Sequence, residues 1–158
     1  MQDRVINVVI AGLGGQGVIT ASDVVAEAAF RAGYDVKKSE LHGMSQRGGS
    51  VSSDIRFGRT VLSPMVPTGE ADFLVVIDPD QAEPNRHLLG PGGVLITPNL
   101  IGEDALENRR SINMALLGTL SKYLQIPESD WMAAIRANLA EKLHEMNVKA
   151  FAVGKAAG

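Results

Sequence analysis

Gly12-Leu13-Gly14-Gly15-Gln16-Gly17, the glycine turn, is the stretch of sequence that decides the fold. An apolar run at residues 5–11 precedes it, and residues 18–23 continue with a helical pattern. This order predicts a buried strand, a tight turn and a helix, as in a dinucleotide-binding unit. Because glycine has no Cβ, the backbone N–H groups of such a turn can face an anion at the helix N-terminus. A strand-to-helix turn without any ligand is the alternative interpretation of the same pattern.

The composition is that of an ordinary globular domain. The chain has 158 residues, of which 45% are hydrophobic and 21% are charged, enough for one domain with a substantial core. A net charge of -3 gives no electrostatic reason to expect binding to nucleic acid or to an anionic membrane. The chain has no cysteine, which excludes disulfides and cysteine-ligated iron–sulfur clusters, and its three histidines have no metal-ligand spacing.

The sequence also lacks targeting and membrane signals. No apolar run approaches the roughly 20 residues that cross a bilayer, and the first residues lead directly into a strand without a signal-peptide pattern. We therefore expect a cytoplasmic protein with a single domain at residues 1–153 and a short tail at residues 154–158.

Apolar periodicity predicts a layered α/β fold. Strands are predicted at residues 6–11, 34–39, 50–57, 61–66, 73–77 and 94–98, and helices at 17–32, 78–87, 112–124, 129–139 and 143–151. Residues 6–11 and 73–77 are apolar on both faces and should be central strands. Residues 50–57 alternate, and we expect them to form an antiparallel hairpin with residues 61–66. The expected architecture has three layers, with a mixed, mainly parallel sheet and helices on both faces.

A second glycine-rich stretch, His42-Gly43-Met44-Ser45-Gln46-Arg47-Gly48-Gly49, has the composition of a loop. An arginine beside glycines is suited to holding a phosphate or a carboxylate. The alternative is a surface loop in which Arg47 pairs with Glu40 or Asp54. From these residues alone, both interpretations stay open.

The charged residues that follow two of the predicted strands bear on which ligand the chain could bind. In a nicotinamide-binding unit the second strand ends in an acid that binds the ribose hydroxyls. Here that position carries Lys37 and Lys38, with Glu40 just beyond, which counts against a nicotinamide cofactor. Asp78 follows a central strand, where ligands bind in open α/β sheets, but capping of the next helix is the favoured role.

Together the two glycine-rich stretches resemble the gamma-type subunit of the 2-oxoacid:ferredoxin oxidoreductases. The form K-x-x-x-x-H-G-M-S-Q-R-G-G, which begins at Lys37, is most similar to the beta subunit of indolepyruvate:ferredoxin oxidoreductase. Further matches are Gly69-Glu70-Ala71-Asp72 and Asn113-Met114-Ala115-Leu116-Leu117-Gly118. The resemblance covers nearly the whole chain, but the connection at residues 101–111 is shorter than in typical members.

The resemblance implies a fold like the gamma domain of pyruvate:ferredoxin oxidoreductase and a role in a complex. Such enzymes decarboxylate a 2-oxoacid on thiamine diphosphate, pass electrons through iron–sulfur clusters to ferredoxin and release an acyl-CoA. It implies that this chain is a subunit acting on indolepyruvate or a similar arylpyruvate, inactive alone, with thiamine diphosphate and the clusters held by partner subunits. The missing cysteines and the missing G-D-G…N thiamine signature agree with this division. A homodimer stays open.

The residues that match the family's shared motif are the candidates for binding a cofactor or another anionic group. They are Gly12, Gly14, Gly15, Gln16, Gly17, His42, Ser45, Gln46, Arg47, Gly48 and Gly49. We expect Arg47, Gln46 and the N–H groups of the glycine turn to hold a CoA phosphate, the edge of the thiamine diphosphate, or a substrate carboxylate. No catalytic or metal-binding residue is predicted. A free-standing nucleotide-binding domain and an interaction scaffold are the competing functions.

Overall fold

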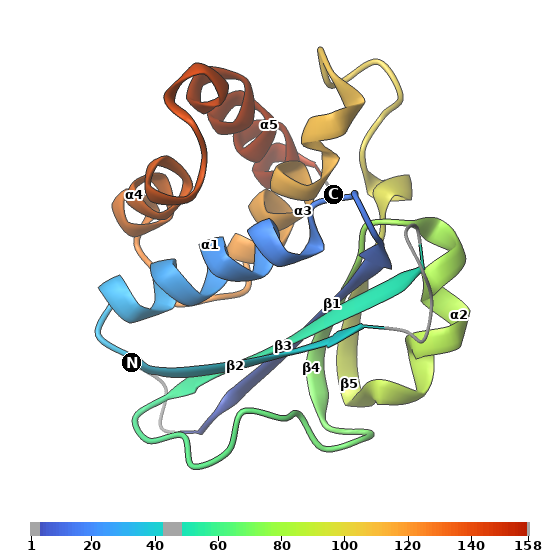
Figure 1. The fold of residues 1–158 in the computed structure, drawn as a ribbon, viewed down its shortest axis with the longest axis vertical. Coiled ribbons are helices and arrows are strands. Elements are labelled where there is room, and N and C mark those ends of the chain that lie inside the picture. The colour runs from blue at the N-terminus through green and yellow to red at the C-terminus, as the bar shows by residue number, and fades with distance from the viewer. Residues whose placement is uncertain (1–3, 43–48, 158) are drawn as a thin grey trace.

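A computed structural model describes residues 4–42 and 49–157, with His42 described only by its backbone. One five-stranded sheet carries the fold (Figure 1). Its strands are β1 (Ile6–Leu13), β2 (Asp35–His42), β3 (Ser50–Gly58), β4 (Ala71–Val76) and β5 (Leu89–Ile96). The order across the sheet is β2-β3-β1-β4-β5. Since neither β1 nor β4 lies at an edge, the prediction that these two strands are internal is confirmed.

The sheet is mixed and mainly parallel, as predicted. Strand β1 pairs in parallel with β4, and β4 pairs in parallel with β5. Strand β3 pairs antiparallel with both β1 and β2, so it alone among the described strands runs in the opposite direction. The alternation in β3 is real, because Ile55 and Phe57 are buried under helices while Asp54 and Arg56 face the other side.

The predicted hairpin between residues 50–57 and 61–66 is wrong. Both edges of β3 are already paired, with β1 and β2, so no edge is free for a third partner. Residues 61–66 instead cross the second face of the sheet without forming a strand. The N–H group of Val66 donates to Asp54 Oδ2 at 2.9 Å, and Arg56 Nη1 donates to the carbonyl oxygen of Ser63 at 2.9 Å. Side chains of β3, rather than its backbone, therefore hold this segment.

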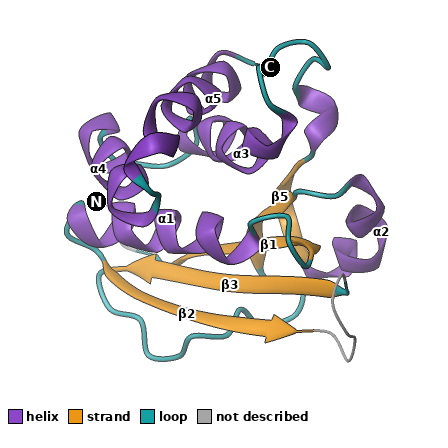
Figure 2. Cartoon of the chain, turned by 45° about the horizontal axis from the view of Figure 1, so that its top comes forward, coloured by secondary structure: helices purple, strands orange, loops and turns teal. Residues whose placement is uncertain are grey.

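Helices α1 (Val18–Arg31), α3 (Ile112–Ser121), α4 (Glu128–Asn138) and α5 (His144–Ala156) cover one face of the sheet (Figure 2). They bury the main core against Val8 and Ile10 of β1. On the opposite face, Val9 and Ala11 pack with residues of the short helix α2 (Ala82–Asn85) and its flanking 3₁₀ turns. Helices thus lie on both faces, although the second helical layer is only one turn long.

Several element boundaries differ from the sequence-based expectation, and strand β2, expected at residues 34–39, continues to His42. Strand β5 begins at Leu89, so residues 90–93 lie within it, at a register irregularity against β4, rather than forming a separate turn. Helix α5 continues through Ala156, past residue 151, where the predicted helix ends. Gly154 is buried in that helix against Ala115 of α3.

Asp54 gives this fold a predicted pH dependence. The residue is only 8% exposed, and burial raises the pKa of its carboxyl, against smaller lowering effects from the Val66 N–H group and Arg56. The folded state therefore binds the proton more tightly than the unfolded state, whose pKa is near 3.8. Stability should fall as the pH rises from that value through the raised pKa, by about 1.4 kcal/mol for each pH unit that separates the two pKa values.

The variant Asp54→Asn should lose this slope, because its amide oxygen can still accept the Val66 hydrogen bond but cannot ionise. Urea unfolding at a series of pH values between about 4 and 7 measures the difference from the parent chain. The exposed Asp80→Asn is the control, since it removes the same charge without the burial. Parallel stability curves for the Asp54 variant and the parent chain would contradict the prediction.

Candidate functional site

The glycine turn joins β1 to α1 as the sequence predicts. Strand β1 ends at Leu13, and α1 begins at Val18. Gly15 and Gly17 have positive φ angles of 88° and 81°, which an L side chain rarely adopts. At Gly17 a Cβ would also lie 2.5 Å from Asn113 Nδ2, so both backbone geometry and packing require glycine there.

Gln16 organises the turn through its side chain. Its Oε1 accepts a hydrogen bond from the Leu13 N–H group at 2.7 Å, and its Nε2 donates to Asp78 Oδ2 at 2.9 Å. The other carboxylate oxygen of Asp78 accepts from the Asp80 N–H group at 2.9 Å, so Asp78 caps the next helical turn as predicted. Gln16 therefore ties the glycine turn to the carboxyl end of β4.

The predicted cradle of free N–H groups is only partly present. The N–H group of Leu13 is taken by Gln16, that of Gly14 donates to the carbonyl oxygen of Gly49 at 2.8 Å, and that of Gln16 donates to the Leu13 carbonyl at 3.1 Å. Only the N–H groups of Gly15 and Gly17 have no partner within the described part of the turn and its surroundings. An anion at this turn would need donors from elsewhere.

The second glycine-rich stretch falls mostly outside the described residues. Ser45, Gln46, Arg47 and Gly48 lie there, and His42 is described only by its backbone. Its last residue, Gly49, is hydrogen-bonded to Gly14, so the end of this stretch lies beside the glycine turn.

The carboxylates proposed as surface partners for Arg47 have other partners. Glu40 accepts a hydrogen bond from Lys38 Nζ at 2.8 Å, and Asp54 accepts one from Val66. Lys38 also pairs with Asp23 on α1. Burial lowers the pKa of Lys38, but its bonds to Asp23 and Glu40 outweigh this, and the net pKa is raised. Lys38 and Glu40 thus lie within β2 rather than at its end, and Lys38 is a paired cation.

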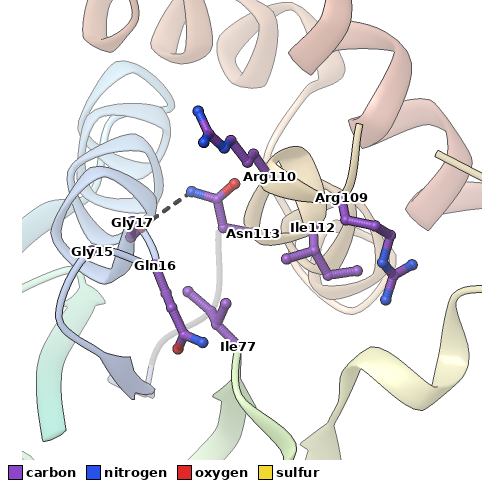
Figure 3. A pocket seen from close by; sticks show the side chains of 8 residues that line it. All are labelled: Gly15, Gln16, Gly17, Ile77, Arg109, Arg110, Ile112 and Asn113. Carbon is purple, nitrogen blue, oxygen red and sulfur yellow. Dashed lines mark hydrogen bonds between the residues drawn. The ribbon is translucent and has the colours of Figure 1, made fainter. Parts of the chain in front are cut away.

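A cavity of about 530 Å³ lies between the glycine turn and the start of α3 (Figure 3). Its walls are Gly15, Gln16, Gly17, Ile77, Arg109, Arg110, Ile112 and Asn113. The two arginines come from the 3₁₀ turn Arg109–Ser111, which leads into α3. No functional role was predicted for residues 102–110, where the only indication was a pair of arginines shortly before Asn113.

Asn113 joins the two sides of this cavity. The residue is 8% exposed, and its side-chain Nδ2 donates to the carbonyl oxygen of Gly17 at 3.2 Å (Figure 3). Its Oδ1 accepts from the Met114 N–H group at 2.9 Å. The start of α3 is therefore held against the glycine turn, although nearly a hundred residues separate them in the chain.

Another cavity, of about 340 Å³, lies beside the same turn and is lined by residues 13–15 and 17–20 together with Val51. Within residues 4–42 and 49–157, no group of three or more His, Cys, Asp or Glu side chains could hold a metal ion. No helix in this part of the chain is long and apolar enough to cross a membrane.

Comparison with known proteins identifies relatives over most of the chain. The indolepyruvate oxidoreductase subunit IorB of Thermococcus kodakarensis is 40% identical over 137 residues, which are 87% of this chain and 66% of the relative. The IorB subunit of Methanothermobacter thermautotrophicus is 30% identical over 187 aligned positions, with 94% of this chain and 95% of the relative covered. Because 187 exceeds the 158 residues of this chain, that relative contains residues that this chain lacks.

The fold is also that of a known subunit. The gamma subunit of a keto/oxoacid ferredoxin oxidoreductase from Geobacter sulfurreducens superimposes with a TM-score of 0.79, covering 98% of this chain and 99% of that one, at 21% identity. This superposition confirms the fold class expected from the sequence, and the relatives above confirm the resemblance. The family model described as "Pyruvate ferredoxin/flavodoxin oxidoreductase" matches residues 7–100 and 98–157. The chain belongs to the pyruvate ferredoxin/flavodoxin oxidoreductase family.

Proposed function

We propose that this chain is a subunit of a 2-oxoacid:ferredoxin oxidoreductase of the indolepyruvate type. The observation that carries the proposal is the 40% identity to an indolepyruvate oxidoreductase subunit across 87% of the chain. The chain spans 66% of the length of that relative. In this chain, the family model matches from residue 7 to residue 157. The complex would oxidatively decarboxylate an arylpyruvate to its acyl-CoA and pass the electrons to ferredoxin.

Within that complex, thiamine diphosphate and the iron–sulfur clusters belong to partner subunits. The absence of cysteine from this chain supports that assignment for the clusters. This chain would contribute a wall of the active-site mouth, built from the carboxyl ends of β1 and β4 with the glycine turn between them. That edge of an open α/β sheet is where ligands bind.

At this wall we assign Arg47 and Gln46 to hold an anionic group of a ligand. The hydrogen bond from Gly14 to Gly49, the last residue of the second glycine-rich stretch, supports this assignment. The engagement of Glu40 by Lys38 and of Asp54 by Val66 supports a role for Arg47 other than a surface ion pair. A CoA phosphate, the outer edge of the cofactor diphosphate and a substrate carboxylate all fit this chemistry.

The test of the proposed function is assembly and turnover. The chain should copurify from its native host with a thiamine-binding, cysteine-rich subunit, identified by mass spectrometry. The purified complex should then reduce ferredoxin with indolepyruvate and CoA, whereas the chain alone should turn over no 2-oxoacid. Turnover by the isolated chain, or failure to associate with any thiamine-binding subunit, would refute the proposal.

Within the assembled complex, Arg47→Ala should lower kcat/KM for CoA or for the 2-oxoacid by about 10- to 100-fold. This is the loss of one charge-assisted hydrogen bond, about 1.5–3 kcal/mol. Arg86→Ala is the matched control, because Arg86 forms an ion pair with Glu83 at 2.8 Å on α2 and its neighbouring turn. Unchanged kcat and KM for both substrates in an intact Arg47→Ala complex would leave Arg47 as a surface residue.

A free-standing nicotinamide-binding domain is less well supported. Within β2, Lys38 is hydrogen-bonded to Glu40, so the acid that would bind ribose hydroxyls is already engaged. Saturable binding of NAD by the isolated chain would favour this alternative over the proposed complex.

A further inference from the structure

We propose that the outer edge of strand β2 binds β2 of a second copy of this chain, so that the two sheets continue into each other through an antiparallel strand pair. This surface goes beyond the proposed function, and it uses none of the residues that line the two cavities beside the glycine turn. Pairing of two copies needs no other subunit, so it can be measured on the purified chain.

The outer edge of β2 is open to another strand. This strand is eight residues long and lies at one end of the strand order. Within residues 4–42 and 49–157, no strand pairs with its outer side (Figure 2). It pairs with β3 residue by residue from Asp35 to His42, and it contains no proline. Such an edge presents a row of backbone N–H and C=O groups that another strand can bind.

The opposite edge of the sheet is built differently. Strand β5 carries Pro91 and the glycines at residues 90, 92 and 93, and its register against β4 is irregular. Gly92 also has a positive φ of 75°. Proline and local irregularity are features by which proteins prevent pairing at a sheet edge. Strand β2 has neither, so the arrangement of its charged side chains decides what can pair with it.

Two-fold symmetry restricts the register of such a pair. The contact is reciprocal between the copies, and directly opposite residues of an antiparallel pair lie on the same face of the sheet. Since successive residues of a strand alternate between faces, opposite residues must be an even number of positions apart, with one residue of each copy on the symmetry axis. Two such registers leave only one residue of β2 unpaired: residues 35–41 around Lys38, and residues 36–42 around Ser39.

The charges of β2 select the register around Ser39. In the register around Lys38, the two copies of that lysine would lie directly opposite each other. Around Ser39, each Lys38 instead lies opposite Glu40 of the other copy, and this happens twice because of the symmetry. Glu40 accepts a hydrogen bond from Lys38 of its own strand at 2.8 Å, so each Glu40 would lie between two lysines. Opposite charges directly across two strands stabilise their pairing, whereas like charges weaken it.

The other face of β2 suits the same register. Leu41 is 50% exposed, although it is a large apolar side chain. In the register around Ser39 it lies opposite Lys37 of the second copy, whose aliphatic stem can cover it while the amine stays in water. The two Ser39 side chains meet on the axis and bring neither charge nor bulk. Strand β2 is therefore complementary to itself on both faces.

The absence of cysteine from the chain allows a direct test of the register. Ser39→Cys introduces a single thiol, and opposite Cα atoms on the axis would be about 4.5–5.5 Å apart, within the range of a disulfide. Oxidation of the full-length variant with copper phenanthroline should give a covalent dimer in non-reducing electrophoresis. Lys37→Cys is the matched control, because its thiol would lie on the same face but opposite Leu41, and it should stay largely uncrosslinked.

Sedimentation velocity at a series of protein concentrations gives the dissociation constant of the dimer. Glu40→Lys should raise this Kd by about 10-fold or more, because it replaces two pairs of opposite charges with two pairs of like charges. Glu145→Lys, on α5, makes the same charge change at an exposed position and should leave the Kd unchanged. A mixture of Glu40→Lys and Lys38→Glu chains should form heterodimers, since each charge again lies opposite its counterpart.

Three results would overturn the proposal. They are a parent chain that stays monomeric at its highest soluble concentration, a dimer that Glu40→Lys does not weaken, and crosslinking of Lys37→Cys as fast as that of Ser39→Cys. Circular dichroism checks that each variant is folded. A chain that assembles into an active complex without pairing through β2 would leave the proposed function standing while this inference fails. A chain that dimerises through β2 but joins no thiamine-binding subunit would support this inference while the proposed function fails.

Discussion

Gly154→Ala should lower the free energy of unfolding by about 3 kcal/mol or more, because helices α3 and α5 are packed backbone against backbone. A Cβ at Gly154 would overlap the carbonyl oxygen of Ala115, and one at Gly118 would overlap that of Phe151. Thr119 Oγ1 also donates to the Gly154 carbonyl at 2.8 Å across the same contact. The obstacle in each case is backbone, which cannot rotate away as a side chain can, so the two helices would have to separate.

Urea unfolding of the variant and the parent chain measures this loss. Gly102→Ala is the control, since the nearest atom to its new Cβ would be the Ala105 Cβ at 3.9 Å, an ordinary contact. The control should change stability by less than about 0.5 kcal/mol. A Gly154→Ala chain as stable as the control would show that α5 can shift away from α3 at little cost.

Gly17→Ala should have the second large effect, about 2–4 kcal/mol. The positive φ of Gly17 costs an L residue about 1–2 kcal/mol, and the new Cβ would lie 2.5 Å from Asn113 Nδ2 and break that side chain's bond to the turn. Gly15→Ala is a matched control, because Gly15 has a similar φ of 88° but nothing within 4 Å of a new Cβ.

The difference between the two alanine variants therefore isolates the contact between the glycine turn and α3. Asn113→Ala combined with Gly17→Ala completes a double-mutant cycle. If the contact with Asn113 is responsible, Gly17→Ala should cost much less in the Asn113→Ala background. Equal losses for Gly15→Ala and Gly17→Ala would mean that backbone strain alone explains both.

Local patterns predicted much of the fold because burial leaves a periodic trace in the sequence. The two-sided apolar runs identified β1 and β4 as internal strands, and the alternation in β3 identified its buried face. Gly33, which follows the predicted helix at residues 17–32, has a φ of 98°, the conformation that favours glycine after a helix. The prediction of a hairpin between residues 50–57 and 61–66 was wrong because local periodicity carries no information about strand pairing. An alternating strand shows which face is buried, but it does not show which strand pairs with it.

Some features of the candidate site could likewise be predicted from the sequence, and others could not. The sequence by itself determined the glycine turn, the capping role of Asp78 and the family, because each depends on residues close together in the chain or on a motif. Only the tertiary structure shows that Gln16 and Gly49 accept hydrogen bonds from N–H groups of the glycine turn. It alone also shows that Arg109 and Arg110 line the cavity beside this turn. Those contacts depend on α3 lying against the glycine turn through Asn113 and Gly17, a packing between distant segments that no local periodicity records.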